Sequence, residues 1–254
     1  AFKKANLIID FTVPKCTFEV LKIASKLKKR VIIGTTGFSK KEENLIKKYA
    51  KKIPILRAGN MSLGINLLMY LTEIASKLKK KVVIGTTGFS KKEENLIKKY
   101  SRKIPILRAG NMSLGINLLM YLTEIASKSL GNNFLSKVFE IHHKHKKDHP
   151  SGTALMLGKG IAVGKNKEFY KLIGKKYLNK KSFPYGKKIN FNSLRKDEVV
   201  GLHEVKFSSG KEIITLNHEA FDRALYSEGA FTAAKWLMNK KPGLYSMRDV
   251  LNFK

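Results

Sequence analysis

The pattern of apolar and polar positions in the first half of the chain predicts short buried strands that alternate with helices. Apolar runs without strict alternation, typical of strands buried on both faces of a parallel sheet, occur at 7–12, 31–36 and 53–60. Stretches with the helical period follow at 39–52 and 62–77. Because strands that alternate with helices form right-handed crossover units, we predict a doubly wound α/β domain.

This strand and helix pattern occurs twice in the chain. Residues 24–74 (the first copy) recur at 75–125 (the second copy) with four conservative differences and an offset of 51 residues. Solenoid repeats come in three or more diverged copies, so two nearly identical copies indicate a recent tandem duplication or an error of sequence assembly. We expect the spare copy to extend the edge of the sheet or to pack poorly.

The composition is strongly basic, with 51 Lys and Arg against 19 Asp and Glu and a net charge of +32. Such a balance is compatible with a nucleic-acid-binding module. Only seven of the basic residues are Arg, however, and the Lys residues follow the predicted solvent faces of helices, so we do not expect nucleic acid as a partner. The positive field would instead attract a polyanionic cofactor or a dicarboxylate.

Other features of the chain bear on its compartment. The hydrophobic content of 43% excludes a disordered tail, and no apolar run approaches the roughly 20 residues of a membrane helix. The single cysteine, Cys16, cannot form an internal disulfide, so we expect a cytoplasmic protein. The chain enters directly into strand-like sequence without an initiator Met or a signal peptide, and we expect that the beginning of the protein precedes Ala1.

Ligands of doubly wound sheets bind beyond the carboxyl ends of the strands, so the residues at these ends are candidates for cofactor binding. The candidates are Gly34, Thr35 and Thr36 in the first copy, and Gly85, Thr86, Thr87, Ala109, Gly110, Asn111 and Met112 in the second. For Asn111 and Met112 the second copy is favoured, because its last helix continues directly into the second half. For the Gly-Thr-Thr segments both copies stay open, and simple strand-to-helix turn chemistry is the alternative.

The segment EIHHKHKKDHPSGT, residues 140–153, contains four of the six histidines. Lysines alternate with the imidazoles and would repel a divalent cation, and no cysteine is available, so we predict no metal site. A solvated basic loop is one interpretation, and chemistry on an anion is the other.

The end of this segment predicts the start of a helix, where free N–H groups and the helix dipole favour a bound carboxylate or phosphate. Gly152 would let the ligand approach the backbone, and Thr153 would add a hydroxyl donor. His142 and Lys146, just upstream, are side-chain types that are readily tuned to release a proton, the lysine because of its cationic neighbours. The segment therefore places proton donors beside an anion site.

These residues resemble a known family. EIHHKHKKDHPSGTAL is similar to the signature of the dihydrodipicolinate reductases of lysine (diaminopimelate) biosynthesis, and IIDFTVP, VIIGTTGFS, AGNMSLGIN and RKDEVVGLHEV also resemble that family in its order. The resemblance covers essentially the whole chain. It implies NAD(P)H-dependent reduction of 4-hydroxy-tetrahydrodipicolinate, a small dicarboxylate, to tetrahydrodipicolinate, with NADH or NADPH as the cofactor and no membrane partner.

On matching positions, the resemblance implies roles for individual residues. His142 would be the proton donor or acceptor and Lys146 the proton donor, whereas His143, Gly152 and Thr153 would bind the substrate. The cofactor contacts would fall on the Gly-Thr-Thr and Ala-Gly-Asn-Met segments named above.

The resemblance also implies the domain organisation. Residues 1–128 would form an incomplete Rossmann-like dinucleotide-binding domain, joined by C-terminal helices at 222–254. Residues 129–221 would form an α+β domain with an open mixed sheet that binds the substrate and assembles a homotetramer, and the alternating runs at 205–216 predict a hairpin there. Arg195 and His203 lie at the approaches to this hairpin, and Arg195 would either reach a carboxylate or form an ordinary ion pair.

One element of the family pattern is missing from the sequence. The family opens with a strand, a glycine-rich phosphate loop and a helix, and none of these is found here. We therefore expect weak dinucleotide binding, and a catalytically impaired fragment of the enzyme stays as an alternative function.

Overall fold

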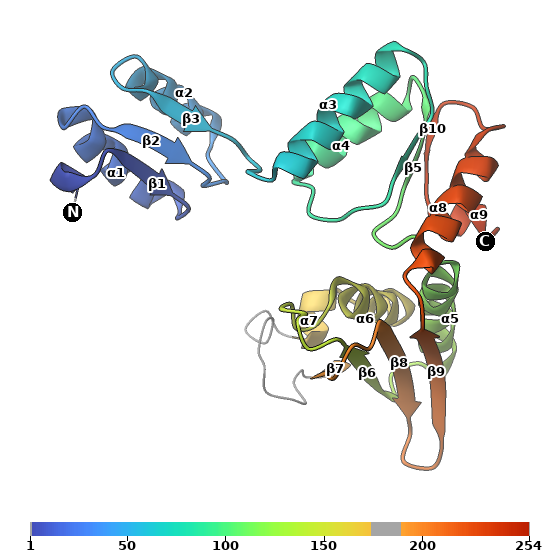
Figure 1. Ribbon diagram of the computed structural model, residues 1–254. Helices are drawn as coiled ribbons and strands as arrows, with labels where there is room; N and C mark the ends of the chain where they lie inside the picture. Colours follow the sequence, from blue (N-terminus) through green and yellow to red (C-terminus); the bar gives the residue numbers. More distant parts are fainter. Residues whose placement is uncertain (1, 174–188, 254) are drawn as a thin grey trace. The chain divides into compact units, whose positions relative to one another are not determined.

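The computed structural model describes residues 2–173 and 189–253 (Figure 1). The chain divides into two compact units. Unit 1 comprises Ala1–Ile74 and Gly88–Ile97, and unit 2 comprises Ala75–Thr87 and Lys98–Lys254. The boundary passes through two helices of the repeat, α3 (Leu63–Lys77) and α4 (Lys91–Ser101). The domain boundaries expected from the sequence do not coincide with these units, and they stay a prediction.

Unit 1 is built on a parallel sheet with the strand order β1-β2-β3. Its elements are η1 (Phe2–Lys4), β1 (Leu7–Asp10), α1 (Pro14–Lys26), β2 (Arg30–Ile33), α2 (Lys40–Ala50), β3 (Ile55–Arg57) and α3 (Leu63–Lys77). Helix α2 begins where the sequence predicts, because the Ser39 hydroxyl accepts the N–H of Glu42 and the Glu42 carboxylate accepts the N–H of Ser39. Leu21, Val31 and Ile33 are central to its apolar core.

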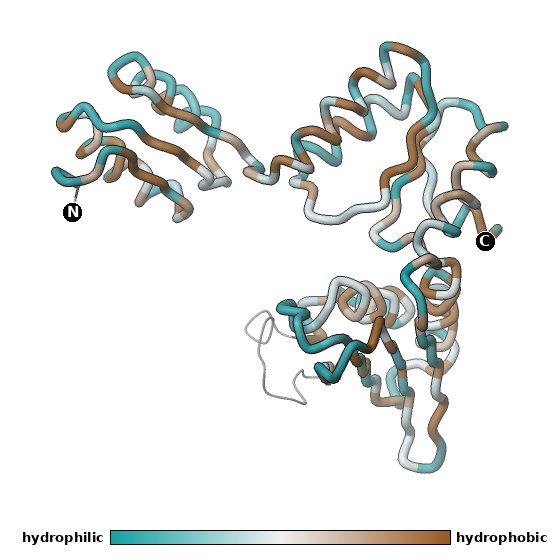
Figure 2. The backbone as a smooth tube through the Cα atoms, viewed as in Figure 1, coloured by the Kyte–Doolittle hydropathy of each residue, from teal (hydrophilic) through white to brown (hydrophobic). Residues whose placement is uncertain are grey.

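Unit 2 contains a second parallel sheet, with the order β10-β5-β4. Its elements are β4 (Val82–Ile84), the end of α4 (Lys91–Ser101) from Lys98 onward, β5 (Pro105–Arg108), α5 (Leu114–Leu130), α8 (Ala224–Leu237), β10 (Gly243–Tyr245) and α9 (Met247–Val250). The C-terminal segment thus returns to this sheet, as expected from the family: β10 pairs with β5, and Ala233 and Leu237 of α8 pack against Leu107 and Met112. Figure 2 shows that β5 is among the more apolar segments of the backbone.

The rest of unit 2 is a mixed sheet with the order β7-β6-β8-β9, in which β6 and β7 are parallel and the other pairs are antiparallel. Its elements are β6 (Leu135–His142), α6 (Gly152–Gly164), α7 (Phe169–Ile173), β7 (Ile189–Arg195), β8 (Gly201–Ser208) and β9 (Ile213–Ala220). The core combines Phe191 and Phe207 of the sheet with Leu157 and Ile161 of α6 and Leu119 of α5. A parallel-sheet α/β fold with an additional open mixed sheet is confirmed.

The two copies of the repeat have the same order of elements but different neighbours. Strand β2 of the first copy pairs with β1, whereas β5 of the second copy pairs with the C-terminal β10. The expectation that the spare copy would extend the same sheet is wrong, because β1 and α1 supply the first copy with its own sheet and core. Helix α3 of this copy is poorly packed, as expected for a spare copy, since Leu63, Leu67 and Leu71 are exposed. Each copy is completed by a segment from outside the repeat.

Candidate active site

The site is built where β6 ends, on the face of the mixed sheet that is covered by helices. Glu140 and His142 lie two residues apart on β6, so their side chains point to the same face, and both are buried. The sheet register places His203 of β8 opposite Glu140, and Arg195 of β7 opposite His142. Three neighbouring strands therefore bring one carboxylate, two imidazoles and one guanidinium together.

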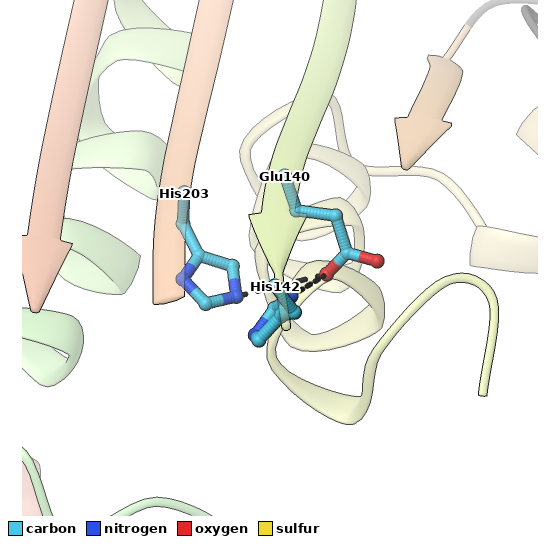
Figure 3. Close-up of side chains that lie close together, drawn as sticks. All are labelled: Glu140, His142 and His203. Carbon is cyan, nitrogen blue, oxygen red and sulfur yellow. Dashed lines mark ion pairs between the residues drawn. The ribbon is translucent and has the colours of Figure 1, made fainter. Parts of the chain in front are cut away.

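The carboxylate of Glu140 is the centre of this cluster, and its side chain is 1% exposed. Its Oε1 accepts a hydrogen bond from the backbone N–H of Ser151 at 3.0 Å and one from Nη2 of Arg195 at 3.2 Å. Its Oε2 lies 3.5 Å from Nδ1 of His142 and 3.7 Å from Nε2 of His203, so it faces both imidazoles (Figure 3).

Burial controls the ionisation of this cluster. It lowers the pKa of His142 to about 4 and that of His203 to about 3, and in each case it outweighs the attraction of Glu140. Burial alone would raise the pKa of Glu140, but hydrogen bonds from Ser151 and the proximity of His142 outweigh it and lower that pKa. At neutral pH the site therefore holds a carboxylate between two neutral imidazoles.

The loop after β6 carries Lys146, which forms an ion pair with Asp148 at 2.8 Å. Arg195 fastens this loop, because its guanidinium donates to the carbonyl oxygens of Lys146 at 3.3 Å and of Asp148 at 2.5 Å. That cationic neighbours tune Lys146 stays a prediction. The side chains of Lys144 and Lys147 are exposed, and the turn of the loop brings a carboxylate to the Lys146 ammonium instead.

Helix α6 begins as the sequence predicts. Ser151 is its N-cap, and the Ser151 hydroxyl accepts the N–H of Ala154 at 3.1 Å. The N–H groups of Gly152 and Thr153 lie in the first turn, where an α-helix provides no internal acceptor, and they supply donors for an anion. A Cβ at Gly152 would meet nothing within 4 Å, so the backbone there faces open space.

A cavity of about 420 Å³ joins these parts. Its lining combines residues that were predicted from the sequence with residues that were not. The full lining consists of Thr87, Gly110, His142, His143, Lys146, Asp148, Ser151, Gly152, Thr153, Met156, Val200, Arg223 and Tyr226. All belong to unit 2, so the two proton-donor candidates, the start of α6 and the segments that follow β4 and β5 share one cavity.

The remaining cofactor candidates of the second copy lie around this cavity rather than in its lining. The side-chain amide of Asn111 donates to the Thr153 hydroxyl at 3.1 Å, which ties the end of β5 to the start of α6. Ala109 and Met112 are buried, and Gly85 is packed so closely that an added Cβ would lie 2.8 Å from Cγ of Met112. The Thr86 hydroxyl donates to the carbonyl oxygen of Thr87.

The first copy offers its candidates in a different setting. Gly34, Thr35 and Thr36 belong to unit 1 and are not among the residues that line the cavity. The Thr35 hydroxyl accepts the N–H of Thr12 at 2.9 Å and donates to the buried carboxylate of Asp10 at 3.2 Å. Thr35 is therefore already engaged within its own unit.

The cluster of Glu140, His142 and His203 also has the composition of a metal site, since the potential ligand atoms lie within 4.8 Å of one another. A divalent cation is disfavoured because the guanidinium of Arg195 already neutralises the carboxylate and the ammonium of Lys146 lies nearby. That the chain has no metal site stays a prediction.

Sequence reasoning gave no role to Glu140 or His203 and left Arg195 undecided. One signal was present: Glu140 and His142 alternate along an apolar strand, so both had to face the core, where a carboxylate needs partners. The contributions of His203 and Arg195 depend on pairing between strands far apart in the chain.

Comparisons with known proteins place the chain among its relatives. Residues 1–61 and 65–112 match the family model "Dihydrodipicolinate reductase, N-terminus", and residues 115–251 match "Dihydrodipicolinate reductase, C-terminus". A 4-hydroxy-tetrahydrodipicolinate reductase of Pelagibacter ubique is 64% identical over 253 residues, which cover 100% of this chain and 78% of the relative. The corresponding protein of Buchnera aphidicola is 43% identical over 187 residues, with 73% and 68% covered.

The fold has a counterpart among solved structures. A dipicolinate-bound dihydrodipicolinate reductase from Paenisporosarcina sp. TG-14 superposes with a TM-score of 0.60, at 17% identity, over 98% of each chain. Fold and site define an α/β protein in which two candidate proton donors and the start of a helix share a cavity. With both family models matched, the chain belongs to the dihydrodipicolinate reductase family.

Proposed function

We propose that this chain is an NAD(P)H-dependent oxidoreductase that reduces 4-hydroxy-tetrahydrodipicolinate to tetrahydrodipicolinate, with loss of water, in lysine biosynthesis. The observation that carries the proposal is the single cavity that joins His142, Lys146 and the start of α6 in a member of this family. The relatives that bear the name of this reductase favour it over a basic nucleic-acid-binding module.

The substrate is a small dicarboxylate, and the cavity offers partners for both of its charges. One carboxylate would accept hydrogen bonds from the N–H groups of Gly152 and Thr153, where the dipole of α6 adds to the attraction. His143 and Lys146 also line the cavity and supply further donors. We infer that these residues fix the ring in one orientation.

Reduction of the ring requires a proton as well as a hydride, and this chain supplies the groups that handle it. Lys146 is oriented by its ion pair with Asp148 at 2.8 Å, and it lines the cavity, where it can donate a proton to the reduced ring. His142 is neutral at physiological pH because it is buried, and it is suited to accept a proton and return it.

NADH or NADPH would supply the hydride, and the second copy offers the residues to hold it. Thr87 and Gly110 line the cavity at the strand ends, and Gly85, Thr86, Ala109, Asn111 and Met112 shape the two turns behind them. The hydrogen bond from Asn111 to Thr153 supports a cofactor at this place, because it joins the turn that would hold the cofactor to the helix start that would bind the substrate. We assign the cofactor contacts to this copy and not to Gly34, Thr35 and Thr36.

The open face of the mixed sheet is proposed as the homotetramer interface. Leu135 and Leu194 point away from the helix-covered face and are exposed, as expected for residues that a partner subunit would cover. Light scattering would measure the assembly. No helix in the described residues is long and apolar enough to cross a membrane, and we propose a cytoplasmic location from the biosynthetic role.

Oxidation of NADH and NADPH, followed by absorbance with freshly prepared 4-hydroxy-tetrahydrodipicolinate, tests the function. We expect turnover that depends on the substrate, and its absence with both cofactors would refute the proposal. The repeat offers matched controls: Asn111→Ala should raise the cofactor KM, whereas Asn60→Ala, at the equivalent place in the first copy, should leave it unchanged.

A further inference from the structure

One oxygen of the Glu140 carboxylate accepts two hydrogen bonds, whereas the other accepts none from the described residues. Oε1 accepts from Ser151 and Arg195, whereas Oε2 has no hydrogen-bond partner within the described part of the chain. Nδ1 of His142, 3.5 Å away, is also buried and without one. A buried polar group without a hydrogen-bond partner destabilises the fold, so an arrangement that leaves two of them face to face needs a reason.

We propose that Glu140 is the positioning residue of His142 and that Arg195 couples it to the loop that carries Lys146. This inference rests on the proposed function. The carboxylate faces Nδ1 and so favours the tautomer with the proton on that nitrogen, which leaves Nε2 free to exchange a proton at the cavity. When His142 takes up that proton, the waiting Oε2 stabilises the imidazolium, and the contact tightens to a charge-assisted hydrogen bond.

Arg195 extends this control to the second proton-handling residue. Its guanidinium bonds to Oε1 of Glu140 at 3.2 Å and to the carbonyl oxygens of Lys146 and Asp148 in the loop. One planar side chain thus connects the strand of His142 with the loop of Lys146. A lysine at this position would keep the charge but could not form this set of bonds, because it lacks the fork of the guanidinium.

The other groups around His142 do not substitute for Glu140. Lys146 and Arg195 oppose its protonation, and Asp148 favours it less strongly than Glu140 does. His203 faces the same carboxylate oxygen at 3.7 Å and is itself neutral. Glu140 is therefore the principal group that favours a charged His142.

The test is Glu140→Gln, which keeps a carbonyl oxygen for the Ser151 N–H but removes the charge. Because Glu140 does not line the cavity, we expect KM to stay within about twofold while kcat falls by about 10- to 100-fold, part of the usual contribution of acid–base catalysis. The limb of the pH profile that reports His142 should move to lower pH, since the attraction of the carboxylate is lost. Glu140→Asp should restore part of kcat.

Two further variants complete the kinetic design. Arg195→Lys should lower kcat and also raise KM, because the loop that it releases carries both Lys146 and His143. Glu204→Gln makes the same chemical change on β8, where Glu204 pairs with Lys206 at 3.0 Å, and it should change neither constant.

Nitrogen NMR of the histidine rings separates the two proposals, because it needs no turnover. In the wild type we expect the His142 signal, identified by its loss in His142→Asn, to show the proton on Nδ1 at neutral pH. In Glu140→Gln the proton should shift towards Nε2. An unchanged tautomer would overturn the positioning role even if the enzyme is active, whereas a shifted tautomer without turnover by the wild type would refute only the proposed function. If Glu140→Gln does not fold, the tautomer of His142 is measured in Arg195→Lys and Glu140→Asp, and these variants test the positioning role in its place.

Discussion

The neutral state of the buried histidines predicts that unit 2 loses stability in mild acid. His203 has a pKa of about 3 in the folded protein, because burial disfavours its charge, against 6.5 for an ordinary histidine. Between these values the unfolded chain binds a proton that the folded chain does not, so stability is lost as the pH falls below about 6.5.

The size of the loss follows from the same numbers. One pKa unit corresponds to about 1.4 kcal/mol, and pH 5 lies about 1.5 units below the unfolded pKa, so His203 alone should cost about 2 kcal/mol between pH 7 and pH 5. His142, with a pKa of about 4, adds to the same trend. A loss of this size is a large fraction of the stability of an ordinary domain.

Urea denaturation at pH 7, 6 and 5 measures this effect. Trp236 is the only tryptophan of the chain and packs against Tyr245 in unit 2, so its fluorescence reports the unfolding of that unit. His203→Gln, which cannot take up the proton, should remove about 2 kcal/mol of the loss at pH 5. The exposed His145→Gln serves as the matched control and should behave as the wild type. Equal pH dependence in His203→Gln and the wild type would refute the argument.

Three further predictions concern packing and chemistry. Gly229→Ala should lower the Tm of unit 2, because the new Cβ would lie 1.8 Å from the carbonyl oxygen of Met112, whereas Gly59→Ala, with nothing within 4 Å, should leave unfolding unchanged; equal scans for both variants would contradict this. Phe191→Ala should destabilise unit 2 by about 3–5 kcal/mol in urea, and a loss below about 1 kcal/mol would show that the site is not a tight core. Lys146→Met should lower kcat by about 100-fold or more with the fold intact by circular dichroism, and near-normal turnover would remove Lys146 from the chemistry.

Features that depend on local sequence were predicted well. The strands and helices of the repeat, the start of α2 at Ser39 and the start of α6 after Ser151 follow from apolar periods and capping residues, which act within a few positions. The closeness of His142 and Lys146 to the helix start at Gly152 follows from their separation in the chain. Local signals therefore located the candidate site.

Features that depend on distant partners could not be read in this way. The positions of Arg195 and His203 follow from the register of β7 and β8 against β6, which is fixed by the whole sheet. The repeat makes the same point, because Leu63 of α3 is 87% exposed, whereas Leu114, its equivalent in α5, packs against the core of unit 2. Identical sequences acquire different environments from their surroundings.

The cross-strand placement of Glu140, His203 and Arg195 has a consequence for how activity arises during folding. A slip of one residue between β6 and β8 would turn Glu140 and His142 towards the opposite surface, and an apolar side chain, Phe139 or Ile141, would take the place of the carboxylate. Catalytic competence would therefore emerge in a single event, when the last of these strands locks into place. Recovery of turnover after dilution from denaturant should then trace the completion of the mixed sheet.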